Sequence, residues 1–173
     1  MRISIIGLPA SGKSLLAREL SRRLHIPHIH LDRFWFEANG QHVKRSEVEK
    51  REVVRAYVKQ KTHEVISQDA WVSDGFYGKA QSDIAARAEL LIFVDIPLFE
   101  RVYNHISRVL RQDHRHAEVS FWEDLAFTSE VILRTFRTGP KIRAFLNTYK
   151  GPLVTIKSRA DMRAYLSQYP EEK

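Results

Sequence analysis

Short apolar runs alternate with longer amphipathic segments along the whole chain, which is typical of a protein with both strands and helices. Residues 90–94, Leu-Leu-Ile-Phe-Val, are apolar without interruption and predict a strand buried on both faces. Five such runs predict strands at residues 2–6, 28–31, 71–73, 90–94 and 153–156.

Between these runs, apolar residues recur at helical spacing. They predict helices from about residue 13 to 24, 46 to 67, 97 to 110, 121 to 137, 141 to 149 and 158 to 168. Gly139-Pro140 is expected to end one helix before the next begins. Because parallel strands need helical crossovers, this alternation predicts an α/β fold in which a parallel sheet carries helices on both faces.

The loop between the first strand and the first helix carries the most specific motif of the chain. Residues 7–14, Gly-Leu-Pro-Ala-Ser-Gly-Lys-Ser, match the phosphate-loop pattern G-x-x-x-x-G-K-[ST]. In such a loop the backbone amides and the helix N-terminus surround phosphate oxygens, the lysine reaches the β- and γ-phosphates, and the serine holds Mg²⁺. We therefore expect a Mg-nucleoside triphosphate to be bound by Gly7, Leu8, Pro9, Ala10, Ser11, Gly12, Lys13, Ser14 and Leu15.

Composition narrows the class of protein. At 173 residues and 43% hydrophobic content, the chain suits one compact domain spanning residues 1–173. The net charge of +7 suggests a polyanionic partner, which could be nucleic acid, an anionic membrane surface or, most simply, the triphosphate itself. No cysteine occurs, so disulfides and thiolate metal sites are excluded. The apolar runs are too short for a signal peptide or a membrane span, so a cytoplasmic protein is expected.

Three aspartates follow predicted strands, at the edge of the sheet where ligands bind in α/β folds. Asp95 ends the run 90–94, the position of a Walker-B acid that holds Mg²⁺; the alternative is a helix N-cap before Pro97. Asp32 could orient or deprotonate an acceptor hydroxyl, and Asp74 with Gly75 could be an acceptor segment or only a turn.

Phosphoryl transfer also needs cations that neutralise the moving group. The stretch 108–116 is dense in arginine and predicts a lid, with Arg134 and Arg137 as a second set from the next helix. The alternative is a solvated basic loop. The first lid candidates are Arg108, Arg111 and Arg115.

Two histidine pairs raise the question of a metal site. His28 and His30 alternate on a predicted strand, and His114 and His116 flank an arginine, so each pair could meet a zinc ion. Without a further ligand at fixed spacing, rim or solvent-exposed histidines without metal are the preferred interpretation. The aromatic run 34–36 could stack on a base or ring, or cap the core.

Taken together, the chain resembles the P-loop kinases of adenylate-kinase type, and most closely the adenylate-kinase-like proteins known as DNA topology modulation proteins. The resemblance rests on residues 5–14, 30–35, 71–77 and 87–97, in this order and spacing. It implies strand order 2-3-1-4-5, ATP and Mg²⁺ at the loop, an acceptor lobe at about 33–70 and a lid at about 108–120. Tyr77-Gly78 stands where adenylate kinases have proline and a phosphate-binding arginine, and Asn104 stands where the relatives usually have arginine.

The expected function is transfer of the γ-phosphoryl group of Mg-ATP to an unidentified small molecule or nucleotide. The alternative is a nucleotide-dependent regulatory or nucleic-acid-binding protein, although no DNA-reading motif is visible. Expected catalytic residues are Lys13, Asp32, Arg111, Arg115 and Arg134. Expected acceptor-binding residues are Asp32, Arg33, Asp74, Gly75, Tyr77 and Arg87, and expected metal ligands are Ser14 and Asp95.

Overall fold

The computed structural model describes residues 1–30, 47–76, 80–110 and 121–170. Strands and helices alternate along the chain, as the apolar pattern predicts. In chain order the elements are β1 (Arg2–Gly7), α1 (Lys13–Leu24), β2 (His28–His30), α3 (Glu47–Ile66), β3 (Trp71–Asp74), α4 (Ala80–Arg87), β4 (Leu90–Val94), α5 (Leu98–Leu110), α6 (Phe121–Thr148), β5 (Leu153–Ile156) and α7 (Arg159–Leu166).

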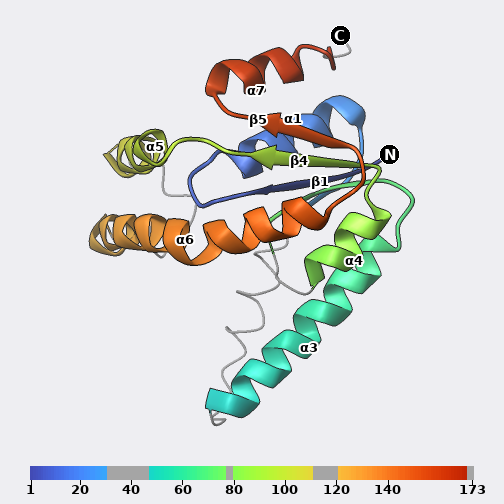
Figure 1. Ribbon diagram of the computed structural model, residues 1–173, viewed down its shortest axis with the longest axis horizontal. Helices are drawn as coiled ribbons and strands as arrows, with labels where there is room; N and C mark the ends of the chain where they lie inside the picture. Colours follow the sequence, from blue (N-terminus) through green and yellow to red (C-terminus); the bar gives the residue numbers. More distant parts are fainter. Residues whose placement is uncertain (31–46, 77–79, 111–120, 171–173) are drawn as a thin grey trace.

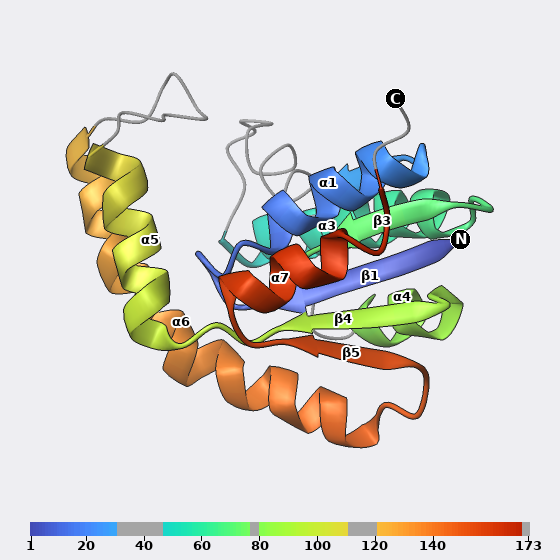
Figure 2. The ribbon, with the colours of Figure 1, turned by 90° about the horizontal axis from the view of Figure 1, so that it is seen from above.

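The strands form one parallel sheet in the order β2-β3-β1-β4-β5, which confirms the order implied by the family resemblance. β1 lies in the centre, with β3 on one side and β4 on the other. All carboxyl ends therefore meet at one edge, the edge at which α5 starts (Figure 2). This edge carries the loop after Gly7, the end of β3 at Asp74 and the end of β4 at Val94.

Helices cover both faces of the sheet, as expected for parallel strands. α1 and α7 lie on one face, and α3, α4 and α6 lie on the other (Figure 1). On the first face the core contains Ile5, Leu16 and Met162 from β1, α1 and α7. On the second face Trp71 packs with Ile84 of α4, while Ile6 packs with Ile142 of α6.

One expected break is absent. α6 runs through Gly139 and Pro140 as a single 28-residue helix instead of ending there. Proline removes one backbone donor, and Figure 2 shows that α6 bends between the part beside α5 and the part beside the sheet. Buried Val131 and Ile142 anchor the two parts, so tertiary packing overrides the local signal. None of the described helices, α6 included, has the combination of length and apolar character needed to cross a membrane.

The periodicity also predicts no element between residues 75 and 90, where the structure has the short helix α4. Its buried side chains are Gln81, Ile84 and Ala85, and only two of these three are apolar. A helix of two turns with so narrow an apolar face gives only a weak periodic signal in the sequence. Its stability depends on packing against the sheet.

Candidate functional site

The phosphate loop joins β1 to α1 and has the backbone shape that its motif requires. Ala10 and Gly12 both have positive φ angles, 60° and 89°. A Cβ atom on Gly7 would lie 2.8 Å from the carbonyl oxygen of Val94, so no larger residue fits there without a shift of backbone. The loop therefore curls tightly between the ends of β1 and β4.

The N-terminus of α1 has features that favour an anion. Gly12 caps the helix without a side-chain hydrogen bond, and the first turn contains no acidic residue. Ser11 is 2% exposed, and its Oγ atom has no hydrogen-bond partner within the described part of the chain. Free helix amides, the positive end of the helix dipole and a buried unpaired hydroxyl are all features that a phosphate group satisfies.

Ser14 is held by a carboxylate from the neighbouring strand β3. Its hydroxyl donates a hydrogen bond to Oδ2 of Asp74, which is completely buried. Asp74 is paired in register with Ile5 of β1, and α1 packs against β3, so the first turn of α1 lies over the end of that strand. The structure thus joins the loop serine to an acid that is 60 positions away in sequence.

Two histidines complete the surroundings of Asp74. His28 Nε2 and His30 Nδ1 lie 3.0 and 2.8 Å from its Oδ1 atom. An ionised carboxylate only accepts hydrogen bonds, so these ring nitrogens carry the protons. Burial alone would raise the pKa of Asp74, but the hydrogen bonds from His28, His30 and Ser14 outweigh it and hold the pKa well below the ordinary range. Asp74 is therefore a charged group in a dry position.

Asp95, the residue expected to hold Mg²⁺ with Ser14, follows β4 on the other side of β1. Its backbone N–H donates to the carbonyl oxygen of Ile156, and its carboxylate interacts electrostatically with Arg101. The structure therefore brings Asp74 to Ser14, and Asp95 to an arginine of α5. The assignment of Asp95 as a metal ligand stays a prediction.

Arg101 is a residue that the sequence pattern did not single out. It is 2% exposed and lies behind the phosphate loop, where Nε donates to the carbonyl oxygen of Ile96 at 3.0 Å and Nη1 to that of Pro9 at 3.4 Å. Nη2 donates to Oγ1 of Thr135 at 2.9 Å. Burial lowers the pKa of Arg101, and Asp95 opposes that shift. One side chain thus links the loop to the segment after β4 and to α6. The signal for it in the sequence is a lone arginine inside the apolar stripe of a helix.

Replacing Arg101 by methionine should destabilise the protein by about 3–5 kcal/mol, because one buried and two partly buried acceptors would lose a charged donor. Urea unfolding measures the change. Arg143→Met, an exposed arginine of α6, is the matched control and should leave the free energy of unfolding almost unchanged. Equal stability of the two variants would show that the links of Arg101 contribute nothing.

Apart from the two arginines of α6, the other predicted site residues divide into three groups. Gly75 follows β3 at the carboxyl edge, where its backbone N–H donates a hydrogen bond to the carbonyl oxygen of Ile5. Arg87 lies at the opposite edge: it ends α4 just before β4 begins, and its guanidinium donates to the carbonyl oxygen of Ile66. The structure thus does not bring Arg87 to the phosphate loop. Asp32, Arg33, Tyr77, Arg111 and Arg115, the side chain of Arg108, and the pair His114 and His116 lie outside the described residues.

Arg134 and Arg137 lie on α6 and are exposed. Their helix lies beside the phosphate loop where Gly139 faces Leu8. It is also linked to the loop indirectly, because Arg101 of α5 donates both to Thr135 and to the carbonyl oxygen of Pro9. A lid role for the two arginines is consistent with this position and stays a prediction.

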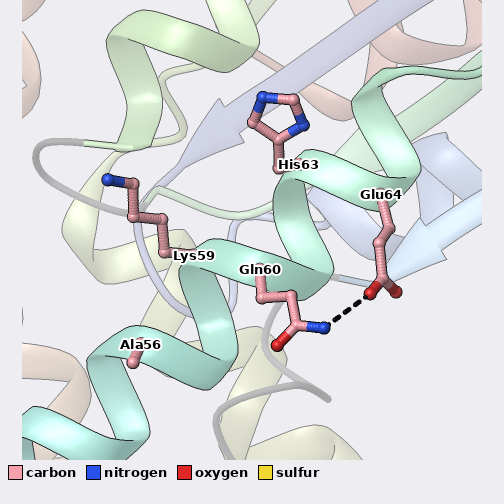
Figure 3. Close-up of a pocket in the computed structure, with 5 residues that line it drawn as sticks. All are labelled: Ala56, Lys59, Gln60, His63 and Glu64. Atoms are coloured by element: carbon pink, nitrogen blue, oxygen red, sulfur yellow. Dashed lines mark hydrogen bonds between the residues drawn. The ribbon is translucent and has the colours of Figure 1, made fainter.

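A surface hollow on α3 lies apart from the phosphate loop. Its described lining residues are Ala56, Lys59, Gln60, His63 and Glu64, all from α3 (Figure 3). Gln60 Nε2 donates to Glu64 Oε1 at 3.0 Å along the helix surface. This bond joins two residues at helical spacing, and none of the five lining residues belongs to the phosphate loop.

Comparisons with known proteins place the fold. No protein-family model and no curated protein matches the sequence. Among solved structures, shikimate kinase from Bacteroides thetaiotaomicron is 19% identical with a TM-score of 0.54, over 97% of this chain and 95% of that one. Shikimate kinase from Acinetobacter baumannii in complex with shikimate is 13% identical with a TM-score of 0.55, over 96% and 89%. TT1252 from Thermus thermophilus is 19% identical with a TM-score of 0.57, over 98% of each chain.

These likenesses extend over nearly the whole length of each chain, at identities that establish the fold alone. They do not bear on the resemblance to the DNA topology modulation family. The parallel sheet of order β2-β3-β1-β4-β5 with helices around it agrees with them, and the chain has the fold of these solved shikimate kinases.

Proposed function

We propose that this protein is an ATP-dependent phosphotransferase that acts on a small molecule or a nucleotide. The observation that carries the proposal is the bond between Ser14 of a complete phosphate loop and the buried, ionised Asp74. Hydroxyl and carboxylate oxygens are the donors that Mg²⁺ prefers, and a loop serine with a strand-end aspartate is the donor set of P-loop enzymes. The kinase names of the structural neighbours support the same reaction class.

The residues present fit a magnesium triphosphate. The uncapped first turn of α1 and the unpaired hydroxyl of Ser11 offer donors to phosphate oxygens. Lys13, the first residue of α1, would add a positive charge beside the β- and γ-phosphates. Ser14 and Asp74 would hold Mg²⁺, with Asp74 acting directly or through water. When bound, the ion neutralises charge that develops on the transferred phosphoryl group.

The chain's own contribution is to hold these groups still before the reaction. Arg101 ties the carbonyl of Pro9 to Ile96, after β4, and to Thr135 of α6. The histidines of β2 hold one oxygen of Asp74 while the other faces Ser14. Pre-organised charges need no reorganisation during the reaction, which is the main electrostatic source of rate enhancement. In this proposal Asp74 acts on the nucleotide side of the site. The acceptor roles of Asp32, Arg33, Gly75 and Tyr77 stay predictions, as does the part of Arg111, Arg115 and Arg134 in charge neutralisation.

The test has two stages. Calorimetry with ATP or GTP and Mg²⁺ should detect binding that disappears when the metal is chelated. Acceptor-stimulated ADP release is then measured over nucleoside monophosphates, sugars and hydroxy acids, shikimate included. We expect one class of acceptor to stimulate release.

Absence of triphosphate binding would overturn the proposal. Tight, salt-sensitive DNA binding in a gel shift, with no acceptor phosphorylated, would favour the alternative drawn from the net charge of +7.

A further inference from the structure

β2 and β3 bring three metal-ligating groups together. His28 and His30 are two positions apart on β2, so both side chains project from the same face of the sheet. The register pairs His30 with Asp74 and His28 with Val72, which places Asp74 on that face as well. The histidine pair, which lacks a third ligand in sequence, gains one from the neighbouring strand.

The geometry of the three groups is compact. His28 Nε2 and His30 Nδ1 both point at Asp74 Oδ1, and one ligand atom from each residue lies within 4.8 Å of the others. Ligands around a tetrahedral zinc ion are spaced by about 3.3 Å, given Zn–N and Zn–O bonds near 2.0–2.1 Å. The present separations of 2.8 and 3.0 Å reach that value with small rotations of the side chains.

Access and charge also suit a cation. Asp74 is fully buried, whereas the His28 and His30 side chains are 23% and 43% exposed, so the cluster opens to solvent on the histidine side. The second oxygen of Asp74 keeps its bond to Ser14. An entering ion would therefore find one negative oxygen and two imidazoles, and water can reach it from the exposed histidine side as a further ligand.

We propose that His28, His30 and Asp74 form a binding site for a divalent first-row transition metal, with Zn²⁺ as the reference ion. Two imidazole nitrogens and one carboxylate oxygen are the donors chosen by Zn²⁺, Co²⁺ and Fe²⁺, whereas Mg²⁺ prefers oxygen ligands only. On metal binding, the proton that faces Asp74 in each ring moves to the other ring nitrogen, and the freed lone pair coordinates the ion. The site is separate from the proposed nucleotide magnesium, which would lie on the Ser14 side of the same carboxylate.

The test measures metal binding to the full chain without nucleotide. Zn²⁺ calorimetry in excess Mg²⁺ should show one site, and Co²⁺ should develop the visible absorption of a four- or five-coordinate ion. The double variant His28→Gln, His30→Asn keeps an N–H donor near each ring-nitrogen position but removes both imidazoles. Its affinity for Zn²⁺ should fall by about 100-fold or more. His63→Gln, an exposed histidine of α3, is the matched control and should bind as the unchanged protein does.

A second measurement needs no variant. Nitrogen NMR of the histidine rings should show His28 Nε2 and His30 Nδ1 shifting on addition of Zn²⁺. The proposal is overturned if the unchanged protein binds no Zn²⁺ in excess Mg²⁺, if the folded double variant binds it with unchanged affinity, or if the ring signals of these two residues do not respond. Binding that His63→Gln abolishes would assign the ion to α3 and would likewise overturn it.

Discussion

Lys13→Ala should reduce phosphoryl transfer by on the order of 10²- to 10³-fold and weaken nucleotide binding, while the protein stays folded. The lysine is the first residue of α1, and in the proposed mechanism it supplies the mobile positive charge of the phosphate loop. Alanine is the best helix former, so the start of α1 should not be destabilised. Calorimetry with Mg-ATP, acceptor-stimulated ADP release and circular dichroism measure the three effects.

Lys141→Ala is the matched control. It removes a lysine from an exposed position of α6 and should leave binding and turnover unchanged. If Lys13→Ala keeps full affinity and full turnover, the phosphate loop does not handle phosphate in this protein, and the kinase proposal fails with it.

Asp74→Asn should abolish the dependence of nucleotide affinity on Mg²⁺ and lower turnover by on the order of 10²-fold. The amide keeps the shape of the side chain but removes the negative charge that faces Ser14. It also replaces charge-assisted hydrogen bonds from His28 and His30 by neutral ones, which should destabilise the fold by about 1–3 kcal/mol. Nucleotide affinity is measured as a function of Mg²⁺ concentration, and stability by urea unfolding.

Asp95→Asn distinguishes the two candidate acids at this edge of the sheet. We expect it to leave the magnesium dependence nearly unchanged, because Asp95 lies across β1 from Asp74 and interacts with Arg101. The opposite result, in which only Asp95→Asn removes the dependence, would assign the metal to the acid that the sequence pattern favours.

The secondary structure and the phosphate loop could be predicted from local sequence because the signals are local. The run 90–94 is apolar on both faces, and the loop motif is contiguous between an apolar strand and an amphipathic helix. Local signals gave the wrong prediction at two places where tertiary packing dominates. Pro140 was expected to separate two helices but lies inside α6, and α4 was not predicted because its apolar face is narrow. The expected role of Arg87 did not follow from the pattern: Arg87 precedes the strand predicted at 90–94, and residues that precede a parallel strand lie at the edge opposite the carboxyl ends.

By itself, the sequence determined that this chain alternates strands with helices, that its sheet is parallel, and that a loop with the phosphate-loop motif follows the first strand. Only the tertiary structure decided which acid meets Ser14: Asp74 and Asp95 lie at the ends of the two strands that flank β1, and the sequence pattern favoured Asp95. α1 packs against β3 and so places Ser14 over Asp74. The same strand pairing brings His28 and His30 to that carboxylate, and the contacts of Arg101 join three separate elements. Side-chain contacts between neighbouring strands, and between helices and the sheet, depend on how the crossover helices pack. The periodicity of apolar residues along the chain does not predict them.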